Sequence, residues 1–283
     1  MSTSEPSLLA SRVIVFRSGG LGDLLLTLPL LRELENLFEE VIMCVPSKYH
    51  FLISEFSNKP ILFDLDQGET ELLKLAAGSQ VVAFWNDPAW IREWKELGVE
   101  KVHVFNPRPM GDLHFSRLLI EPFRKPTTRT KLNQIWFNHE KETPSQLSKN
   151  LWIHPGSGGV DKNLPLLEFI HLSEQWIGKF PQSEVFFSFG EADLELHNQF
   201  LRLDVSSKPR VKNKLFSSLD DFFVSLRNHK GVFAGNDSGP SHLAAMLGLE
   251  THVWFRCTNP TVWAPLGPSV KIYQTDSAPS KIL

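Results

Sequence analysis

The sequence predicts an α/β protein built from two parallel-sheet halves. Short apolar runs alternate with helical patterns over the first 106 residues, and a second alternating series begins at Leu151. Such runs are typical of parallel strands, because helices cover both faces of the sheet. A chain of 283 residues also exceeds the size at which one hydrophobic core usually stops growing. We therefore predict an N-terminal domain over residues 1–147 and a C-terminal domain over residues 148–283.

Each predicted element follows from its apolar pattern. In the first half, strands are expected at 12–16, 40–46, 61–65, 81–85 and 101–106, and helices at 24–38, 71–78 and 91–98. Pro29 falls inside the first helical pattern, where it predicts a kink or a late start. In the second half, strands are expected at 151–156, 184–190, 231–237 and 251–255, and helices at 166–180, 193–203, 219–229 and 242–248. Residues 107–150 are rich in charge, Thr and Pro, as in a connection between domains.

Composition narrows the class of protein. The hydrophobic fraction of 42% and charged fraction of 22% are those of an ordinary globular protein. A net charge of −3 argues against a dedicated nucleic-acid binder. The first ten residues lack a secretory signal, and no stretch reaches 18 uninterrupted apolar residues. Cys44 and Cys257, each in an apparent strand, form neither a zinc pattern nor a disulfide framework. We expect a reduced, cytoplasmic protein with only peripheral membrane contact.

The first loop to inspect is RSGGLGD, residues 17–23, between a predicted strand and a helix. Ligands of open parallel sheets bind at the carboxyl ends of strands. The glycines do not fit G-x-G-x-x-G, and the chain has no P-loop sequence, so a dehydrogenase and a P-loop NTPase both lose support. Asp23 is either a helix cap or a general base. The loop residues that could approach a ligand are Ser18, Gly19, Gly20 and Gly22.

Two loops of the second half carry polar groups at strand ends. In HPGSGGVDKNLP, residues 154–165, the donors are Gly156, Ser157 and Gly158, and Lys162 supplies a positive charge. The alternative is an ordinary turn with a solvated lysine. Glu191 and Glu195 follow the next predicted strand. They could bind ribose hydroxyls, or they are exposed carboxylates on a helix face.

The segment FAGNDSGPSHLAAMLG, residues 233–248, joins an apolar strand to a helix. The first turn of a helix has unpaired N–H groups and the positive end of the helix dipole, so the junction predicts an anion site. Alternatively, Ser238 only caps the helix, and Gly239 and Pro240 open it. The candidate binding residues here are Asp237, Ser238, Gly239, Pro240, Ser241 and His242.

Other chemistries have little support. The single D-x-D string, in FDLDQG at 63–68, lacks the additional oxygen ligands of a metal site, and the ten histidines show no ligand spacing. No G-x-S-x-G elbow is present. We expect neither a metal nor a cofactor.

Local basic charge occurs between residues 108 and 131. Six cations against Asp112 and Glu121 give a net charge of +4 (six minus two). This segment is either a solvated linker or a site for an anionic acceptor or membrane surface. The six cations are Arg108, Arg117, Arg124, Lys125, Arg129 and Lys131.

Taken together, the loops resemble one family. SGGLGDLLLTLPLLREL is similar to the G-D-x-[VL]-x-T-x-P-x-[LI] segment of the family 9 glycosyltransferases, the ADP-heptose:lipopolysaccharide heptosyltransferases. HPGSGGVDKNLPLLEF resembles their H-P-G-x-x-x-x-x-K-x-W-P segment. GNDSGPSHLAAMLG and CTNPTVWAPLG resemble their D-[ST]-G-x-x-H-x-A-A and T-[DN]-P-x-x-[WY]-x-P-x-G segments. The order and spacing of these segments span nearly the whole chain.

The resemblance implies a GT-B fold, in which two Rossmann-like domains face each other across a cleft. It implies a sugar acceptor, an anionic glycolipid or glycan, on the N-terminal domain, and a nucleotide-sugar donor such as ADP-heptose on the C-terminal domain. Asp23 matches the catalytic base of the family, Lys162 its phosphate-contacting lysine, and residues 237–242 its diphosphate loop. The implied reaction is a metal-independent, inverting sugar transfer in the cytoplasm or at the cytoplasmic face of the inner membrane.

The sequence departs from the family pattern at three places. Leu164 replaces the usual Trp, Asn259 replaces the commoner Asp, and the sequence ends soon after residue 272, without the usual long final segment. These departures leave two alternatives open: a transferase that uses another nucleotide sugar, and a binding protein of the same fold without catalysis.

Overall fold

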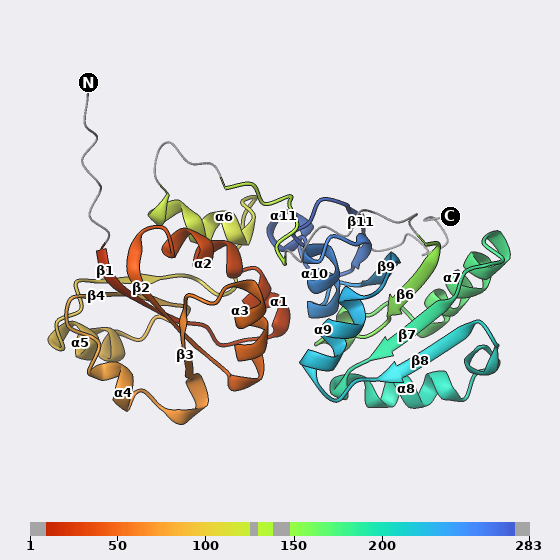
Figure 1. The fold of residues 1–283 in the computed structure, drawn as a ribbon, viewed down its shortest axis with the longest axis horizontal. Helices are drawn as coiled ribbons and strands as arrows, with labels where there is room; N and C mark the ends of the chain where they lie inside the picture. The colour runs from red at the N-terminus through yellow and green to blue at the C-terminus, as the bar shows by residue number, and fades with distance from the viewer. Residues whose placement is uncertain (1–9, 125–129, 138–147, 275–283) are drawn as a thin grey trace, which may run out of the picture. The chain divides into compact units, whose positions relative to one another are not determined.

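The computed structural model describes residues 10–124, 130–137 and 148–274. The chain forms two compact units: the first contains the chain up to Gly19 and Thr27–Thr130, and the second contains Gly20–Leu26 and the chain from Lys131. Each unit is a parallel sheet flanked by helices (Figure 1). The predicted α/β class with two Rossmann-like units is therefore confirmed. The predicted boundary at residue 147 borders 138–147, which lie outside the described residues, and stays a prediction.

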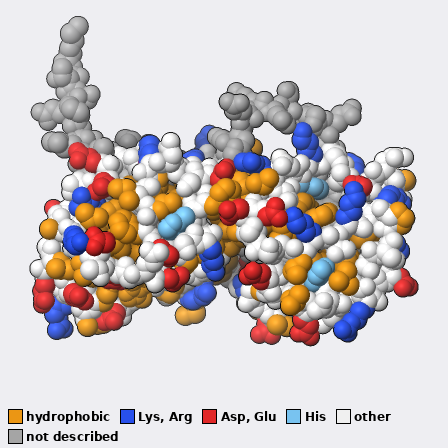
Figure 2. Space-filling model, turned by 60° about the horizontal axis from the view of Figure 1, so that its bottom comes forward, with side chains coloured by type: hydrophobic (Ala, Val, Ile, Leu, Met, Phe, Trp, Pro, Cys, Tyr) orange, Lys and Arg blue, Asp and Glu red, His pale blue; other side chains and the backbone are white. Residues whose placement is uncertain are grey.

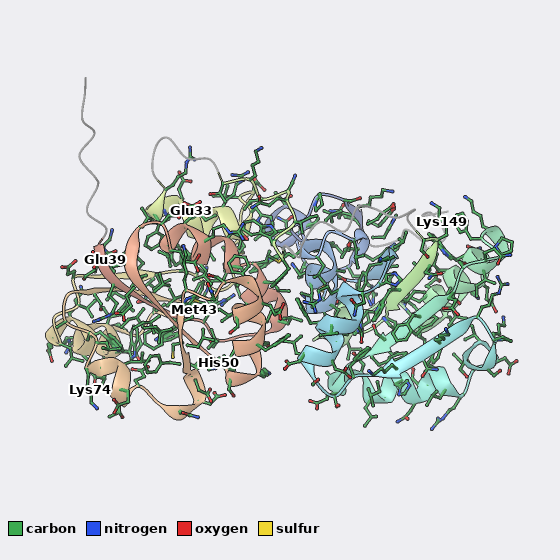
Figure 3. The ribbon with its side chains drawn as sticks, viewed as in Figure 1. Glu33, Glu39, Met43, His50, Lys74 and Lys149 are labelled. Carbon is green, nitrogen blue, oxygen red and sulfur yellow. The ribbon has the colours of Figure 1, made fainter. Side chains whose placement is uncertain are left out.

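The first unit contains a five-stranded sheet of order β3-β2-β1-β4-β5. Side chains alternate along β1, so Ile14 and Phe16 enter one core face, where they pack with Trp94 of α5. His50, labelled in Figure 3, joins α3 to β3 through a 3.2 Å contact between its Nε2 and the Phe63 carbonyl. The strands are β1 (Ala10–Phe16), β2 (Phe38–Val45), β3 (Ile61–Asp64), β4 (Ser79–Ala83) and β5 (Lys101–Val104). The helices are α2 (Leu28–Leu34), α3 (His50–Phe56), α4 (Thr70–Leu73), α5 (Pro88–Glu96) and α6 (Phe115–Ile120).

The second unit contains a six-stranded sheet of order β11-β10-β9-β6-β7-β8, and all of its neighbouring strands are parallel. The strands are β6 (Asn150–His154), β7 (Val185–Phe189), β8 (Val211–Leu215), β9 (Gly231–Asn236), β10 (Glu250–Phe255) and β11 (Val270–Gln274). The helices are α1 (Leu21–Leu25), α7 (Leu166–Lys179), α8 (Leu194–Leu201), α9 (Leu219–Arg227), α10 (Gly239–Met246) and α11 (Pro260–Trp263). Phe187 and Phe200 lie in the core between this sheet and its helices.

Three expectations about elements are resolved by the structure. The predicted helix 24–38 is two shorter helices, α1 and α2, and α2 begins one residue before Pro29, which agrees with a late start. The predicted end is wrong, because α2 ends at Leu34 and β2 begins at Phe38. Strands β8 and β11, the two edges of the second sheet, escaped prediction because polar and exposed side chains replace an apolar run there. The edge strands β3 and β5 of the first sheet have apolar runs and were predicted. Cys44 is buried in β2 as expected, but Cys257 is exposed and lies beyond the end of β10.

Charge is distributed evenly on the face drawn in Figure 2, where basic and acidic side chains are interspersed. This pattern agrees with the small net charge. Among the described residues, none of the helices has the length and apolarity needed to cross a membrane.

Candidate active site

The site is built at the switch point of the second sheet. From β6, the chain continues to β7 and β8 on one side, and β9, β10 and β11 lie on the other. The loops after β6 and β9 therefore leave adjacent strands at the point where the strand order reverses. Doubly wound sheets bind ligands at this point, at the carboxyl ends of the strands.

Asn236, the last residue of β9, ties these two loops together. Its buried side chain donates from Nδ2 to the Pro155 carbonyl at 2.7 Å. Its Oδ1 accepts from the Leu164 backbone N–H at 3.0 Å. Both ends of the 155–164 loop are thus attached to β9, and this attachment sets the position of Lys162 within the loop.

Asp237 is the centre of a charged cluster. Its Oδ2 accepts from Lys162 Nζ at 2.8 Å and from Thr258 Oγ1 at 2.5 Å. The Nε2 of His242 lies 3.6 Å from Oδ1, longer than a normal hydrogen bond. Burial alone would raise the pKa of Asp237, but His242 and Lys162 together hold this pKa well below its ordinary value. Asp237 is therefore an ionised carboxylate between two basic groups.

The first turn of α10 follows directly. Ser238 occupies the N-cap position in extended conformation, yet its side chain makes no capping hydrogen bond. Its hydroxyl lies 3.4 Å from that of Ser241, which donates to the Asn236 carbonyl at 2.6 Å. The alternative interpretation, that Ser238 caps the helix through its side chain, is therefore wrong. The N-terminal end of α10 keeps its positive dipole without a side-chain acceptor from Ser238.

Helix α1 packs against this end of α10, and two glycines allow the approach. A Cβ on Gly239 would lie 2.6 Å from the Cβ of Leu21, and a Cβ on Gly22 would lie 3.3 Å from Cδ2 of His242. The sequence places 20–26 in the N-terminal domain, but this segment belongs to the second unit. The contact of α1 with α10, which the helical pattern does not report, accounts for this grouping.

Asp23 lies in the first turn of α1 and is half-buried. Its Oδ2 accepts from the Gly20 backbone N–H at 2.9 Å. The carboxylate therefore accepts a backbone hydrogen bond at the N-terminus of α1. This contact does not test the expectation that Asp23 is a general base.

The remaining predicted residues lie on the loops before α1 and after β6, in the turn Glu191–Asp193 and at the start of α8. Ser157 is engaged in its own turn, where its hydroxyl donates to the Gly159 carbonyl at 2.8 Å. Gly158, Glu191 and Glu195 are exposed or open to solvent. The candidates before α1, Ser18, Gly19 and Gly20, are also exposed, and Gly19 has a φ of 116° that favours glycine.

Sequence reasoning missed three residues of the site. Asn236 holds the 155–164 loop, and Thr258 donates to Asp237. Asp193 is buried against Gly156. A usable signal existed for Asn236, because it directly precedes Asp237 at a strand end. No sequence pattern indicates that Asp193 is buried, since the acidic residues near it, Glu191 and Glu195, are exposed.

Two further features concern possible metal ligands and the basic charge of the first unit. Within the described ranges, no group of three His, Cys, Asp or Glu side chains could hold a metal ion. Of the basic cluster, Lys125 and Arg129 lie outside the described residues. Arg117 and Arg124 line a shallow pocket in the first unit, together with Ile120, Glu121 and Thr130.

Comparison with solved structures identifies the type of fold. A family 9 glycosyltransferase from Veillonella parvula is 17% identical, with a TM-score of 0.73, over 97% of this chain and 90% of that chain. The E. coli heptosyltransferase WaaC with ADP is 13% identical, with a TM-score of 0.66, over 93% of both chains. At these identities, the likeness establishes the GT-B type of fold.

Comparison with known sequences identifies the family. A lipopolysaccharide heptosyltransferase 1 from Campylobacter coli is 29% identical over 129 residues, which are 45% of this chain and only 37% of that relative. The sequence model described as glycosyltransferase family 9 (heptosyltransferase) matches residues 123–282, more than half of the chain. With the switch-point site and this match together, the chain belongs to glycosyltransferase family 9.

Proposed function

We propose that this protein is an inverting, metal-independent heptosyltransferase that moves a heptose-type sugar from ADP-heptose to a lipopolysaccharide-core or related glycan. The observation that carries the proposal is the contact of Lys162 with Asp237 beside the N-terminal end of α10, at the switch point of a family 9 chain. An ammonium group and a helix N-terminus are suited to a diphosphate.

In this proposal, the leaving diphosphate is bound by the backbone N–H groups at the start of α10 and by Lys162. Asp237 is itself an anion, so direct contact with phosphate would be repulsive. Its contribution is to hold Lys162 and Thr258 in position through the hydrogen bonds to Oδ2. The solved E. coli relative with ADP supports an adenine nucleotide as the donor component.

Asp23 is proposed as the general base. It takes the proton from an acceptor hydroxyl while that oxygen forms a bond to the anomeric carbon and the bond to ADP breaks. Lys162 and the α10 dipole stabilise the negative charge that develops on the departing diphosphate. A single displacement of this kind inverts the anomeric configuration.

The acceptor is proposed to be an anionic glycolipid or glycan. Arg117 and Arg124 line the pocket of the first unit, and guanidinium groups are suited to bidentate binding of carboxylate or phosphate. Glu121, also in the pocket, lies 3.8 Å from Arg124 and would compete with such an anion for it. An acceptor attached to lipid would bring the protein to the cytoplasmic face of the inner membrane.

Calorimetric titration with ADP, UDP and GDP tests the donor. We expect ADP to bind most tightly, and Lys162→Ala to weaken ADP binding about tenfold or more, since a charged hydrogen bond is worth roughly 1.5–3 kcal/mol. Lys208→Ala removes a surface ion pair with Glu174 and should leave the affinity unchanged. Absence of binding by all three nucleotides would refute the proposed function, and a preference for UDP or GDP would refute the ADP donor.

A further inference from the structure

A buried polar cluster lies below the loop that follows β6. The hydroxyl of Ser188 on β7 contacts two side chains of β6. Trp152 Nε1 donates to Ser188 Oγ at 2.8 Å, and His154 Nδ1 lies 3.0 Å from the same oxygen. On its other side, His154 Nε2 lies 3.5 Å from Asp193 Oδ2. All four side chains are buried.

The Ser188 hydroxyl accepts from Trp152, and its own proton can go to the Ile153 carbonyl at 3.3 Å or to His154 Nδ1. The carboxylate of Asp193 beside Nε2 favours a proton on that nitrogen, so we assign the imidazole proton to Nε2. The Nε2–H then points to Asp193. Burial lowers the pKa of His154, in opposition to the attraction of Asp193, which agrees with a neutral ring. His154 is therefore a neutral ring whose Nε2 lies beside the carboxylate.

Asp193 lies against the backbone of Gly156. Its Oδ2 accepts from the Gly190 N–H at 2.8 Å, and a Cβ built on Gly156 would lie 1.9 Å from its Oδ1. No side chain fits at position 156 while Asp193 holds this place. The need for glycine here is one of volume, because no positive φ is found at Gly156.

We propose that Asp193, held by the Gly190 N–H and packed beside His154, is a positioning residue for the 155–164 loop and thereby for donor binding. The inference rests on the proposed function and deepens it. The carboxylate supports Gly156, the chain then passes through the Ser157 turn to Lys162, and Asn236 attaches the loop at Pro155 and Leu164. Removal of the support is expected to displace Lys162 from the place set by its contact with Asp237.

The test compares four variants. Asp193→Ala removes the support, Asp193→Asn keeps its shape and its acceptor for Gly190, Gly156→Ala inserts the conflicting Cβ, and the double variant Gly156→Ala/Asp193→Ala has room for that Cβ. Asp204→Asn changes an exposed aspartate elsewhere in the same unit and serves as the control. The readouts are the ADP dissociation constant, and kcat at saturating donor.

We expect Asp193→Ala and Gly156→Ala each to raise the ADP dissociation constant about tenfold, as is typical when packed neighbours are coupled. The double variant should be no weaker than either single variant, and Asp193→Asn should stay within about twofold of the wild type. The kcat of the folded protein should fall as well, since a displaced Lys162 stabilises the departing diphosphate less. A general loss of stability would instead lower the active fraction at unchanged affinity.

Amide hydrogen exchange of the ligand-free protein separates this inference from the proposed function. Protection of amides 156–162 should decrease in Asp193→Ala and be retained in Asp193→Asn. If the wild type binds no nucleotide, the proposed function fails, and exchange alone decides the positioning role. Unchanged protection in Asp193→Ala, or additive losses of affinity in the double variant, would overturn the inference.

Discussion

Asp237 is a buried anion that holds the positively charged group of the site, Lys162, in place. A buried carboxylate is costly unless it is paired, and here Lys162, Thr258 and His242 surround it. The same pairing holds the flexible side chain of Lys162 in one place before any ligand arrives. Preorganisation of this kind lowers the entropy cost of binding an anion.

Replacement of Asp23 by Asn separates its capping role from its role as a base. Asn retains an oxygen that can accept from the Gly20 N–H, so stability and ADP affinity should be nearly unchanged. It cannot take a proton, so kcat for transfer from ADP-heptose should fall about 10²- to 10⁴-fold. Steady-state kinetics and thermal unfolding measure the two effects.

Asp220→Asn is the matched control, since Asp220 is an exposed carboxylate in the first turn of α9. It should leave kcat at the wild-type value. Full activity of Asp23→Asn would remove Asp23 from the mechanism.

At the scale of elements, the contact between α1 and α10 joins the glycine loop to the anion site. Leu21 packs where a side chain at Gly239 would project, and His242 lies next to Gly22. A Cβ at Gly239 would conflict with Leu21 at this approach. The motif glycines therefore serve helix packing as well as access of a ligand to the backbone.

Gly239→Ala should destabilise the protein by about 1–3 kcal/mol, the usual cost of overpacking, and weaken ADP binding. The added Cβ would lie 2.6 Å from that of Leu21, and neither atom can move without its backbone. Chemical denaturation gives the free energy of unfolding, and calorimetry gives the affinity.

Gly178→Ala provides the comparison, because a Cβ at this position in α7 has open space. It should stabilise by up to about 1 kcal/mol through helix propensity. Equal stability of Gly239→Ala and the wild type would contradict the close packing of α1 on α10.

Apolar patterning predicted all five strands of the first sheet and the interior strands of the second sheet, and it failed at β8 and β11, the edges of the second sheet. Strands β6, β7, β9 and β10 are interior and were expected from their apolar runs. Edge strand β8 reads Val-Lys-Asn-Lys-Leu, and its lysines are typical of an edge protected against further pairing. An edge position is a property of the assembled sheet, so no local pattern reports it.

At the scale of the whole molecule, several histidines are buried in both units. Burial lowers the pKa of His103 in the first unit to about 4, and the pKa values of His154, His229 and His252 in the second unit are also lowered, mainly by burial. An unfolded chain binds protons on these rings below about pH 6.5, and the folded chain does not. Acid therefore favours the unfolded state.

We expect the free energy of unfolding to decrease as the pH falls below about 6.5, by up to about 1.4 kcal/mol per pH unit for each such histidine. The depressed pKa of Asp237 adds a loss of stability below its ordinary range, as that carboxylate is protonated. Urea unfolding between pH 7.5 and 4.5 measures the slope. His103→Gln should make the slope shallower, and a stability independent of pH would contradict the prediction.

The sequence alone determined the fold class, the interior strands, the order of the family segments and the loops that carry Lys162 and Asp237. These features follow from local patterns of apolar and polar residues. Only the tertiary structure decided that α1 belongs with the second unit, that Asn236 and Thr258 complete the site, and that Asp193 is buried under Gly156. Each of these depends on which side chains from distant segments fill one volume, and packing is settled only when the whole chain is folded.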